Sequence, residues 1–213
     1  MAISDADGNF LAIDVGEYGR NSDGRVFREG SIGQAIIQKT LDLLQPSCLQ
    51  GENNKPPFPY YFVVDEAFPL LENLMNPYPR RQLNNTKRIY NYRISRGRKS
   101  IECAFGMLAT KFRILNTPIS RKTEKIDTMI KALCVLHNFI RLHDGVFTLP
   151  SEIFNNDDED GNHFEDEFQQ NNQQLNRTRP TNTAIELRDR LRSYFIQPYA
   201  ALHWQNKYIT GTV

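Results

Sequence analysis

The chain has 213 residues, of which 39% are hydrophobic and 11% aromatic, enough for one globular domain with a core. Its net charge of +1 conceals a basic middle and an acidic late segment. No apolar run could span a bilayer and the first residues do not resemble a signal peptide, which argues against membrane insertion and secretion. Three widely spaced cysteines, Cys48, Cys103 and Cys134, predict free thiols or core residues in a reducing compartment.

The first residues have the pattern of a β-hairpin, with a strand end, an Asp-Gly turn and a second strand over Phe10–Val15. Glycine-rich turn residues follow. They include Asp23 within Ser-Asp-Gly, a sequence that forms turns without needing any further function. Apolar residues at helical spacing then predict a helix over Ser31–Leu44 with Ser31 as its N-cap.

A buried strand and three helices are expected next. The apolar run Tyr60–Asp65 predicts a buried strand with Asp65 at its carboxyl end, and a short helix around Leu70–Met75 follows. A long helix is predicted from Ile89 or Ser95 to Leu115, because its apolar side chains recur every three or four residues and so form one buried face. The helix predicted over Ile126–Leu142 is more apolar still, so we expect it to be core.

The late part of the chain is acidic and polar. Residues 152–168 contain eight acidic residues and no Lys or Arg, which predicts disorder because little apolar surface can be buried. This segment is either a solvated linker or a tether that folds back over basic residues. A last amphipathic helix is predicted over Thr183–Ile196. The expected domains are therefore residues 1–148, a linker at 149–182, and a C-terminal helix and tail at 183–213.

A dense basic field surrounds one carboxylate in the middle of the chain. From Arg80 to Lys122 there are twelve Lys or Arg residues and a single acidic residue, Glu102. Such a field attracts a phosphate backbone, and its interleaved aromatic residues could stack on bases, although a solvated helix face would look similar. The candidate DNA-binding residues are Arg88, Arg93, Arg96, Arg98, Lys99, Lys111 and Arg113.

Two acidic residues could serve phosphodiester chemistry. Transfer or hydrolysis of a phosphodiester is commonly assisted by divalent cations that carboxylates from separate elements hold. Asp65 at a strand end and Glu102 on a following helix fit that requirement. Taken singly, Asp65 is more simply explained as the cap of a turn, and Glu102 as part of a solvated helix face or an ion pair with Arg98. His137 is interpreted as a hydrogen-bonded core residue, and neither a zinc site nor a Ser or Cys nucleophile has support.

Several ordered motifs resemble the PIF/Harbinger transposases and the nucleases derived from them. They cover most of residues 3–145, and their order is more specific than any one of them. The motifs are Phe10-Leu-Ala-Ile-Asp-Val-Gly, Gly19-Arg-Asn-Ser-Asp-Gly-Arg-Val-Phe, Asp65-Glu-Ala-Phe-Pro-Leu, Asn91-Tyr-Arg-Ile-Ser-Arg-Gly-Arg, Ile101-Glu-Cys-Ala-Phe-Gly and Val135-Leu-His-Asn-Phe-Ile-Arg.

The resemblance implies an α/β fold, a ribonuclease H-like mixed sheet flanked by helices, with an Asp, Asp, Glu metal triad. In that triad Asp65 matches the second Asp and Glu102 the Glu, while Asp23 would be an accessory residue near the site. The same resemblance implies Mg²⁺ or Mn²⁺ as cofactor, DNA as substrate and a Myb-like DNA-binding partner. It also implies a nuclear location, with the cytoplasm as a second one.

The chain departs from the family at its start. No residue matches the first Asp, which the family carries on a strand upstream of the hairpin. We therefore expect a chain truncated at its N-terminus, with a sheet that lacks its first, central strand. Three functions follow as hypotheses: a nuclease with an incomplete triad, a domesticated protein that binds DNA or a nuclear partner without cleavage, and a structural or unrelated interaction domain.

Overall fold

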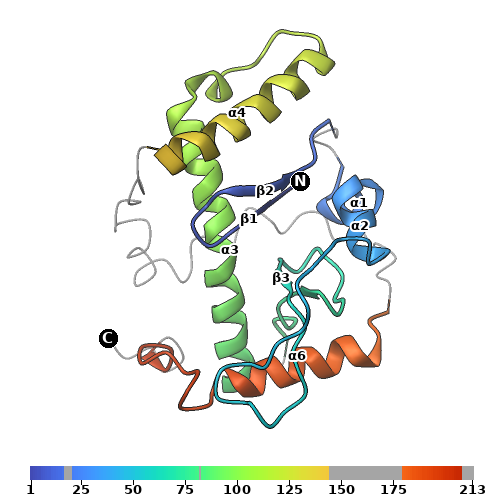
Figure 1. Cartoon of the computed structure of the whole chain (residues 1–213), viewed down its shortest axis with the longest axis vertical. Helices are drawn as coiled ribbons and strands as arrows, with labels where there is room; N and C mark the ends of the chain where they lie inside the picture. The colour runs from blue at the N-terminus through green and yellow to red at the C-terminus, as the bar shows by residue number, and fades with distance from the viewer. Residues whose placement is uncertain (17–20, 82, 144–178, 208–213) are drawn as a thin grey trace.

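The longest element of the protein is helix α3 (Asn85–Lys111), along which the other elements are arranged (Figure 1). The computed structural model describes residues 1–16, 21–81, 83–143 and 179–207. The hairpin and helix α4 lie toward the C-terminal end of α3, and helix α6 crosses its N-terminal end (Figure 1). The predicted acidic segment lies outside the described residues. Within them, no helix is long and apolar enough to cross a membrane.

The predicted N-terminal hairpin is confirmed. Strands β1 (Ala2–Ser4) and β2 (Phe10–Ile13) pair antiparallel, with Ala2 opposite Ile13. The turn between them requires Gly8, which has a φ of 77° and is buried against Met107 of α3. A side chain at this position would strain the backbone and would press against Met107, so a glycine allows the turn to pack directly on α3.

Two short helices follow the hairpin. Helix α1 (Asp23–Glu29) begins at Asp23, at the end of the expected turn segment, and was not predicted. Helix α2 (Ser31–Ile37) lies within the helix predicted over Ser31–Leu44. The prediction that Ser31 caps α2 is wrong, because Gly30 is the N-cap and the Asp14 carboxylate accepts bonds from the Ser31 N–H and hydroxyl at 2.7 and 3.2 Å. The helix ends at Ile37 instead of Leu44, since Lys39 takes a left-handed φ of 54°.

The strand predicted after the long loop is confirmed, but it is short, and its two residues are half-buried and not fully buried. Strand β3 (Phe62–Val63) pairs parallel with β4 (Leu74–Met75). The helix predicted around Leu70–Met75 is wrong, because Leu74 and Met75 are both buried, with 1% and 0% exposure. An element that is buried on both faces shows no helical amphipathicity, and its short apolar run suits a strand.

The two strand pairs form separate sheets. Among the described residues β1 pairs as a strand only with β2, and β3 only with β4. Side chains of β1, β2 and β3 nevertheless pack on one cluster built around Phe27, Ile32, Ile36 and Leu74. The fold is thus a mixed α/β arrangement of helices around short sheets, and a ribonuclease H-like sheet stays a prediction.

Helix α3 begins earlier than predicted. The Asn84 side chain caps it by accepting a bond from the Lys87 N–H at 2.9 Å. The helix ends at Lys111, and a 3-10 turn, η1 (Arg113–Asn116), follows it. The stripe predicted on this helix is buried at Leu108, whereas Phe105 is 47% exposed.

Helix α4 (Thr123–His143) occurs where a helix was predicted, but only part of it is core. Cys134 and His137 are buried, whereas Val135 and Phe139 are 68% and 56% exposed. The prediction of a fully buried helix is therefore wrong for one face. Apolar composition alone does not distinguish a buried helix from one with an uncovered face.

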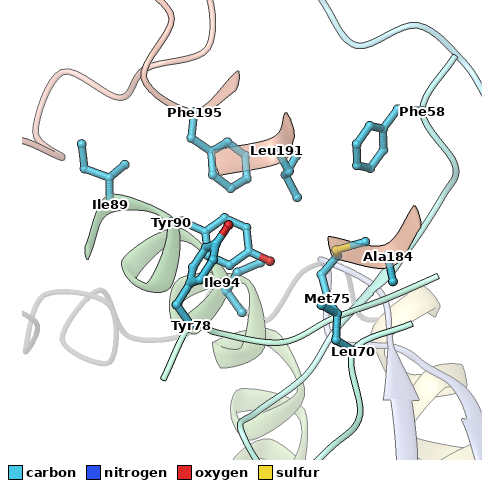
Figure 2. Packing of buried hydrophobic residues seen from close by; sticks show 10 residues of the cluster. All are labelled: Phe58, Leu70, Met75, Tyr78, Ile89, Tyr90, Ile94, Ala184, Leu191 and Phe195. Atoms are coloured by element: carbon cyan, nitrogen blue, oxygen red, sulfur yellow. The ribbon is translucent and has the colours of Figure 1, made fainter. Parts of the chain in front are cut away.

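The main hydrophobic cluster joins the N-terminal half of α3 to α6 (Asn182–Tyr194), a helix that the sequence predicted. Figure 2 shows Leu191 and Phe195 facing Tyr90 of α3. Tyr90 and Ala184 are fully buried. A second cluster holds the hairpin on the C-terminal half of α3 through Phe10, Ala104, Leu108 and Cys134. The division into domains stays a prediction.

All three cysteines are free thiols, as predicted. Cys103 and Cys134 are buried, and burial raises the pKa of both thiols. A raised pKa disfavours the reactive thiolate, which agrees with a packing role for these two residues.

Candidate functional site

Asp65 lies two residues beyond β3 and is half-buried. Its Oδ1 accepts a hydrogen bond from the Ala67 N–H at 2.8 Å, so the side chain stabilises the turn that follows the strand. Its Oδ2 has no hydrogen-bond partner within the described ranges. Asp65 thus caps the turn after β3 through Oδ1, and its Oδ2 is available to a ligand.

Glu102 lies on α3 and is exposed, with 56% of its side chain accessible. Its Oε1 is 2.6 Å from Nη2 of Arg98, one helical turn away, which is the local ion pair that the sequence allowed. An exposed pair of this kind contributes less than about 1 kcal/mol. Glu102 can therefore exchange Arg98 for another cation at little cost.

The contact between β3 and α3 sets the relation of the two carboxylates. A Cβ added to Gly97 would lie 3.2 Å from Val63 Cγ2, so strand and helix pack closely at this point. On an ideal helix Glu102 lies about 7.5 Å farther along the axis than Gly97 and about 140° around it. The turn after β3 and the Glu102 turn are near one another along α3, but the Glu102 side chain extends toward solvent. That the carboxylates of Asp65 and Glu102 bind one metal ion together stays a prediction.

The chemistry of these two donors suits part of a divalent-metal shell. Mg²⁺ takes oxygen ligands, often one or two protein carboxylates completed by water and substrate phosphates. Asp65 Oδ2 and the Glu102 carboxylate are donors of that kind. Over the part of the chain that the structure describes, no group of three or more His, Cys, Asp or Glu side chains could hold a metal ion.

Asp23, the predicted accessory residue, is the first residue of α1 and is exposed. A carboxylate in the first turn of a helix is favoured by the helix dipole, so this position has a local structural explanation. Its role near a metal site stays a prediction.

Arg93 has a structural role that the sequence did not reveal. Its Nη1 donates to the Ala200 carbonyl at 3.1 Å and to Gln205 Oε1 at 3.3 Å. Its guanidinium carbon is 4.4 Å from the centre of the Phe195 ring, a cation–π geometry. Arg93 thus holds the segment after α6 against α3, so it is occupied within the protein.

Arg96 and Arg98 are also engaged in local contacts. Arg96 lies over the Trp204 ring, 5.3 Å from its centre, and donates to the Tyr92 hydroxyl at 3.3 Å. The same hydroxyl accepts a bond from Trp204 Nε1 at 3.1 Å. Arg98 is paired with Glu102. Arg93, Arg96 and Arg98 therefore already interact with other side chains or the backbone of this chain.

The other four predicted DNA-binding residues differ in exposure. Lys99 is half-buried, and Arg88, Lys111 and Arg113 are exposed. Lys99 and Lys111 interact with other groups of the chain. The side chains of Arg88 and Arg113 make no hydrogen bond or ion pair with any described residue. These two are the strongest phosphate-binding candidates of the predicted set.

The sequence analysis did not single out three further cations. Arg121, Lys122 and Lys125 are exposed where α4 begins, and with Ser120 they line a shallow recess. The signal that could have found them is the run Arg121-Lys-Thr-Glu-Lys125 next to a predicted helix start. They lie outside the motifs used above, which explains why the motifs did not identify them.

His137 is a core residue, as the sequence suggested. It is 4% exposed, and its Nε2 donates to the Gly8 carbonyl at 2.9 Å. Burial lowers the pKa of His137, so the neutral ring is favoured. Asn138 makes a reciprocal pair of hydrogen bonds with the Phe10 backbone at 2.9 and 2.8 Å. The Val135-Leu-His-Asn-Phe motif therefore fastens the hairpin to α4.

Comparison with known proteins gives one family and one relative to consider. A family model described as DDE superfamily endonuclease matches residues 1–138, more than half of the chain. The Arabidopsis thaliana protein named "Protein ALP1-like" is 26% identical over 141 residues, which are 66% of this chain and 34% of that protein. This chain thus spans about a third of the relative's length. No solved structure matches it.

Proposed function

This chain belongs to the DDE superfamily endonuclease family, and we propose that it acts on DNA as a metal-dependent endonuclease whose ligands include Asp65 and Glu102. The observation that carries the proposal is that both carboxylates, and the whole of α3 with its basic residues, fall within the matched residues 1–138. The free Oδ2 of Asp65 and the exposed carboxylate of Glu102 support it.

In this proposal the acidic residues bind the metal ion and the basic residues contact the DNA backbone. Asp65 and Glu102 would hold Mg²⁺ or Mn²⁺, which when bound relieves charge on the oxygens of a phosphodiester. Glu102 would leave Arg98 to do so, and the released guanidinium would become available to a phosphate oxygen. Arg88 and Arg113 would position the DNA backbone without reading its sequence.

A second candidate function is DNA binding without cleavage. It is favoured by the ion pair between Glu102 and Arg98, in which the carboxylate is exposed and occupied by an arginine of the same helix. A carboxylate in this position neutralises one arginine and shapes a basic surface. Such a protein would bind DNA with a strong dependence on salt and without a requirement for a divalent cation.

Plasmid nicking separates the two candidates. We expect the chain to nick supercoiled DNA with Mn²⁺ or Mg²⁺, and both Asp65→Asn and Glu102→Gln to abolish nicking while DNA binding is retained. Glu29→Gln is the matched control, because Glu29 also forms an exposed pair with an arginine one helical turn away, Arg25, but lies on α1. Nicking by the Glu102 variant at the control's rate would remove Glu102 from catalysis. Binding without any nicking would favour the second candidate.

The proposal extends to location and partner. An enzyme or binding protein for chromosomal DNA would act in the nucleus, with the cytoplasm as a second location where the chain is made. A Myb-like DNA-binding protein would supply sequence recognition as the partner. Fractionation of cells and co-purification with such a partner test these two points.

A further inference from the structure

Helix α4 has an apolar face that the described part of the chain leaves uncovered. Cys134 and His137 are buried on the side of the helix that packs on the hairpin and α3. Val135 and Phe139 are exposed, and on an ideal helix each lies about 160° around the axis from His137. Leu142, on the same outer side, is 80% exposed. The outer face of a surface helix is usually polar, so this apolar face is suited to a contact with another molecule.

The spacing of the exposed residues on this face is that of a coiled-coil seam. They follow one another at intervals of four, three, four and three residues, and every one of them is exposed: Thr128, Ala132, Val135, Phe139 and Leu142. We call the four apolar members, Ala132, Val135, Phe139 and Leu142, the α4 seam. Alternating intervals of this kind keep the side chains in one line along a helix, where each can insert between side chains of a facing helix. The α4 seam therefore fits a helix as its partner.

The area of this face indicates how strong such a contact can be. Its large apolar residues are between 43% and 80% exposed, which corresponds to roughly 400 Å² of apolar surface: they are Val135, Leu136, Phe139 and Leu142. That is as large as the largest apolar patch on a typical monomer, and about half of the roughly 800 Å² that each partner buries in a standard interface. We therefore expect a weak complex that forms only at high protein concentration.

We propose that the α4 seam pairs with the α4 seam of a second copy of this chain, with the two helices antiparallel and a two-fold axis at the level of His137. This pairing sets Val135 opposite Phe139 of the partner subunit and Ala132 opposite Leu142 of the partner subunit. Each layer then combines a smaller with a larger side chain, which fills the space between the helices evenly. A parallel pairing would place Phe139 against Phe139 and Ala132 against Ala132, so one layer would be crowded and another would contain a void.

The charges near the α4 seam are compatible with this pairing of two copies. Between residues 128 and 143 the outer face of α4 carries no acidic residue, so it has no group that would attract a basic partner. Lys131 flanks the α4 seam, and in the antiparallel pairing it lies about 18 Å along the axis from Lys131 of the partner subunit. Repulsion between these exposed charges is largely screened at that distance. The α4 seam includes none of the residues assigned above to metal or DNA, so this inference does not depend on the proposed function.

The first test is the mass of the full chain in solution as a function of concentration. Sedimentation equilibrium from micromolar to near-millimolar protein should show the average mass rising from that of one chain toward that of two. Val135→Glu/Leu142→Glu should remain monomeric over this range, because dimerisation would bury its carboxylates without partners. Both side chains are mostly exposed in the single chain, so the melting temperature of the dilute variant should be unchanged.

Leu44→Glu is the matched control for the loss of an exposed apolar side chain. Leu44 is 71% exposed but lies in a loop outside α4, so this variant should dimerise like the parent chain. Equal loss of the dimer in the control and in the α4 variant would overturn the inference, since general hydrophobicity would then cause the association. A parent chain that stays monomeric at the highest concentration would also overturn it. If the α4 variant of such a monomer melts at a lower temperature, the α4 seam makes a contact within one chain.

Disulfide cross-linking tests the antiparallel register. Cys48→Ser removes the exposed thiol of the described chain and serves as the background for the cysteine variants. A mixture of Ala132→Cys chains and Leu142→Cys chains should form cross-linked dimers on oxidation. Neither variant alone should do so, because its two copies of the new thiol would lie about 15 Å apart along the axis. Cross-linking of each variant alone would overturn the antiparallel pairing and indicate a parallel one.

Discussion

At the N-terminal end of α3, Arg93 and Arg96 lie over Phe195 and Trp204 and hold the segment after α6. Beyond its C-terminal end, the side chains of Arg113 and Arg121 are exposed and form no hydrogen bond, ion pair or ring contact with a described residue. Both ends are basic in the sequence. The difference lies in Phe195 and Trp204, the aromatic residues after α6 that lie against Arg93 and Arg96, whereas no ring lies over Arg113 or Arg121 among the described residues.

This comparison shows that a count of charges does not locate a binding surface. An arginine stacked on an aromatic ring and bonded to a carbonyl contributes to stability, and moving it to a phosphate would break those contacts. An exposed, unpaired cation has no such contacts to lose. DNA binding should therefore depend on exposed, unpaired arginines such as Arg88 and Arg113, and stability on the stacked Arg93 and Arg96.

The largest expected effect is a loss of stability at the N-terminal half of α3, where the main hydrophobic cluster lies. Tyr90 is 0% exposed, and its ring centre lies 5.1 Å from that of Tyr78 and 6.0 Å from that of Phe195. Tyr90→Ala should lower the free energy of unfolding by about 3 to 5 kcal/mol because it opens a cavity in the main cluster. Phe139→Ala, at a half-exposed aromatic of α4, should cost less than about 1 kcal/mol. Urea unfolding measures both, and equal losses would contradict the difference between the ends.

The next effect concerns a buried carboxylate at the same end. The Glu52 side chain is 2% exposed and lies 2.6 Å from Lys55 Nζ and 3.1 Å from Arg190 Nη2. Burial opposes its ionisation, but the hydrogen bonds from Lys55 and Arg190 outweigh burial and hold the pKa of Glu52 below its ordinary 4.5. Glu52→Gln should lower stability near pH 7 by about 2 kcal/mol, since Arg190 loses its counter-charge.

The pH dependence has a definite sign. A group whose pKa is lower in the folded state stabilises it above the unfolded pKa, and that stabilisation is lost as pH falls through the folded pKa. The parent chain should therefore lose the Glu52 contribution below pH 4.5. Glu52→Gln should lose less over the same range. Unfolding free energies from about pH 3 to 7 measure this, and parallel curves would show that Glu52 does not titrate with folding.

The smallest effects compare two arginines of α3. Arg93→Gln should cost about 1 to 2 kcal/mol of stability, since it removes two hydrogen bonds and a cation–π contact, and should leave the salt slope of DNA binding unchanged. Arg88→Gln should change stability by less than about 0.5 kcal/mol and make the slope shallower by about 0.9. Melting curves and anisotropy titrations on both variants check this. The reverse pattern would show that Arg93 binds DNA.

Much of the local structure could be predicted from the sequence. The hairpin, the strand before Asp65 and helices α3, α4 and α6 were expected from alternation, helical spacing and turn residues. The helix predicted at Leu70–Met75 was wrong because a run buried on both faces has no period to read. Helix α1 was missed because Ser-Asp-Gly forms turns and helix starts alike.

The sequence by itself determined the order of the motifs, the isolation of Glu102 among cations and the position of Asp65 after a strand, because these depend on neighbours along the chain. Only the tertiary structure decided which cations are occupied, that Asp14 caps α2 from 17 residues away, and that one face of α4 is exposed. These outcomes depend on contacts between segments distant in the sequence. Charge and apolarity can be read from residues, but burial and pairing arise only when the segments meet.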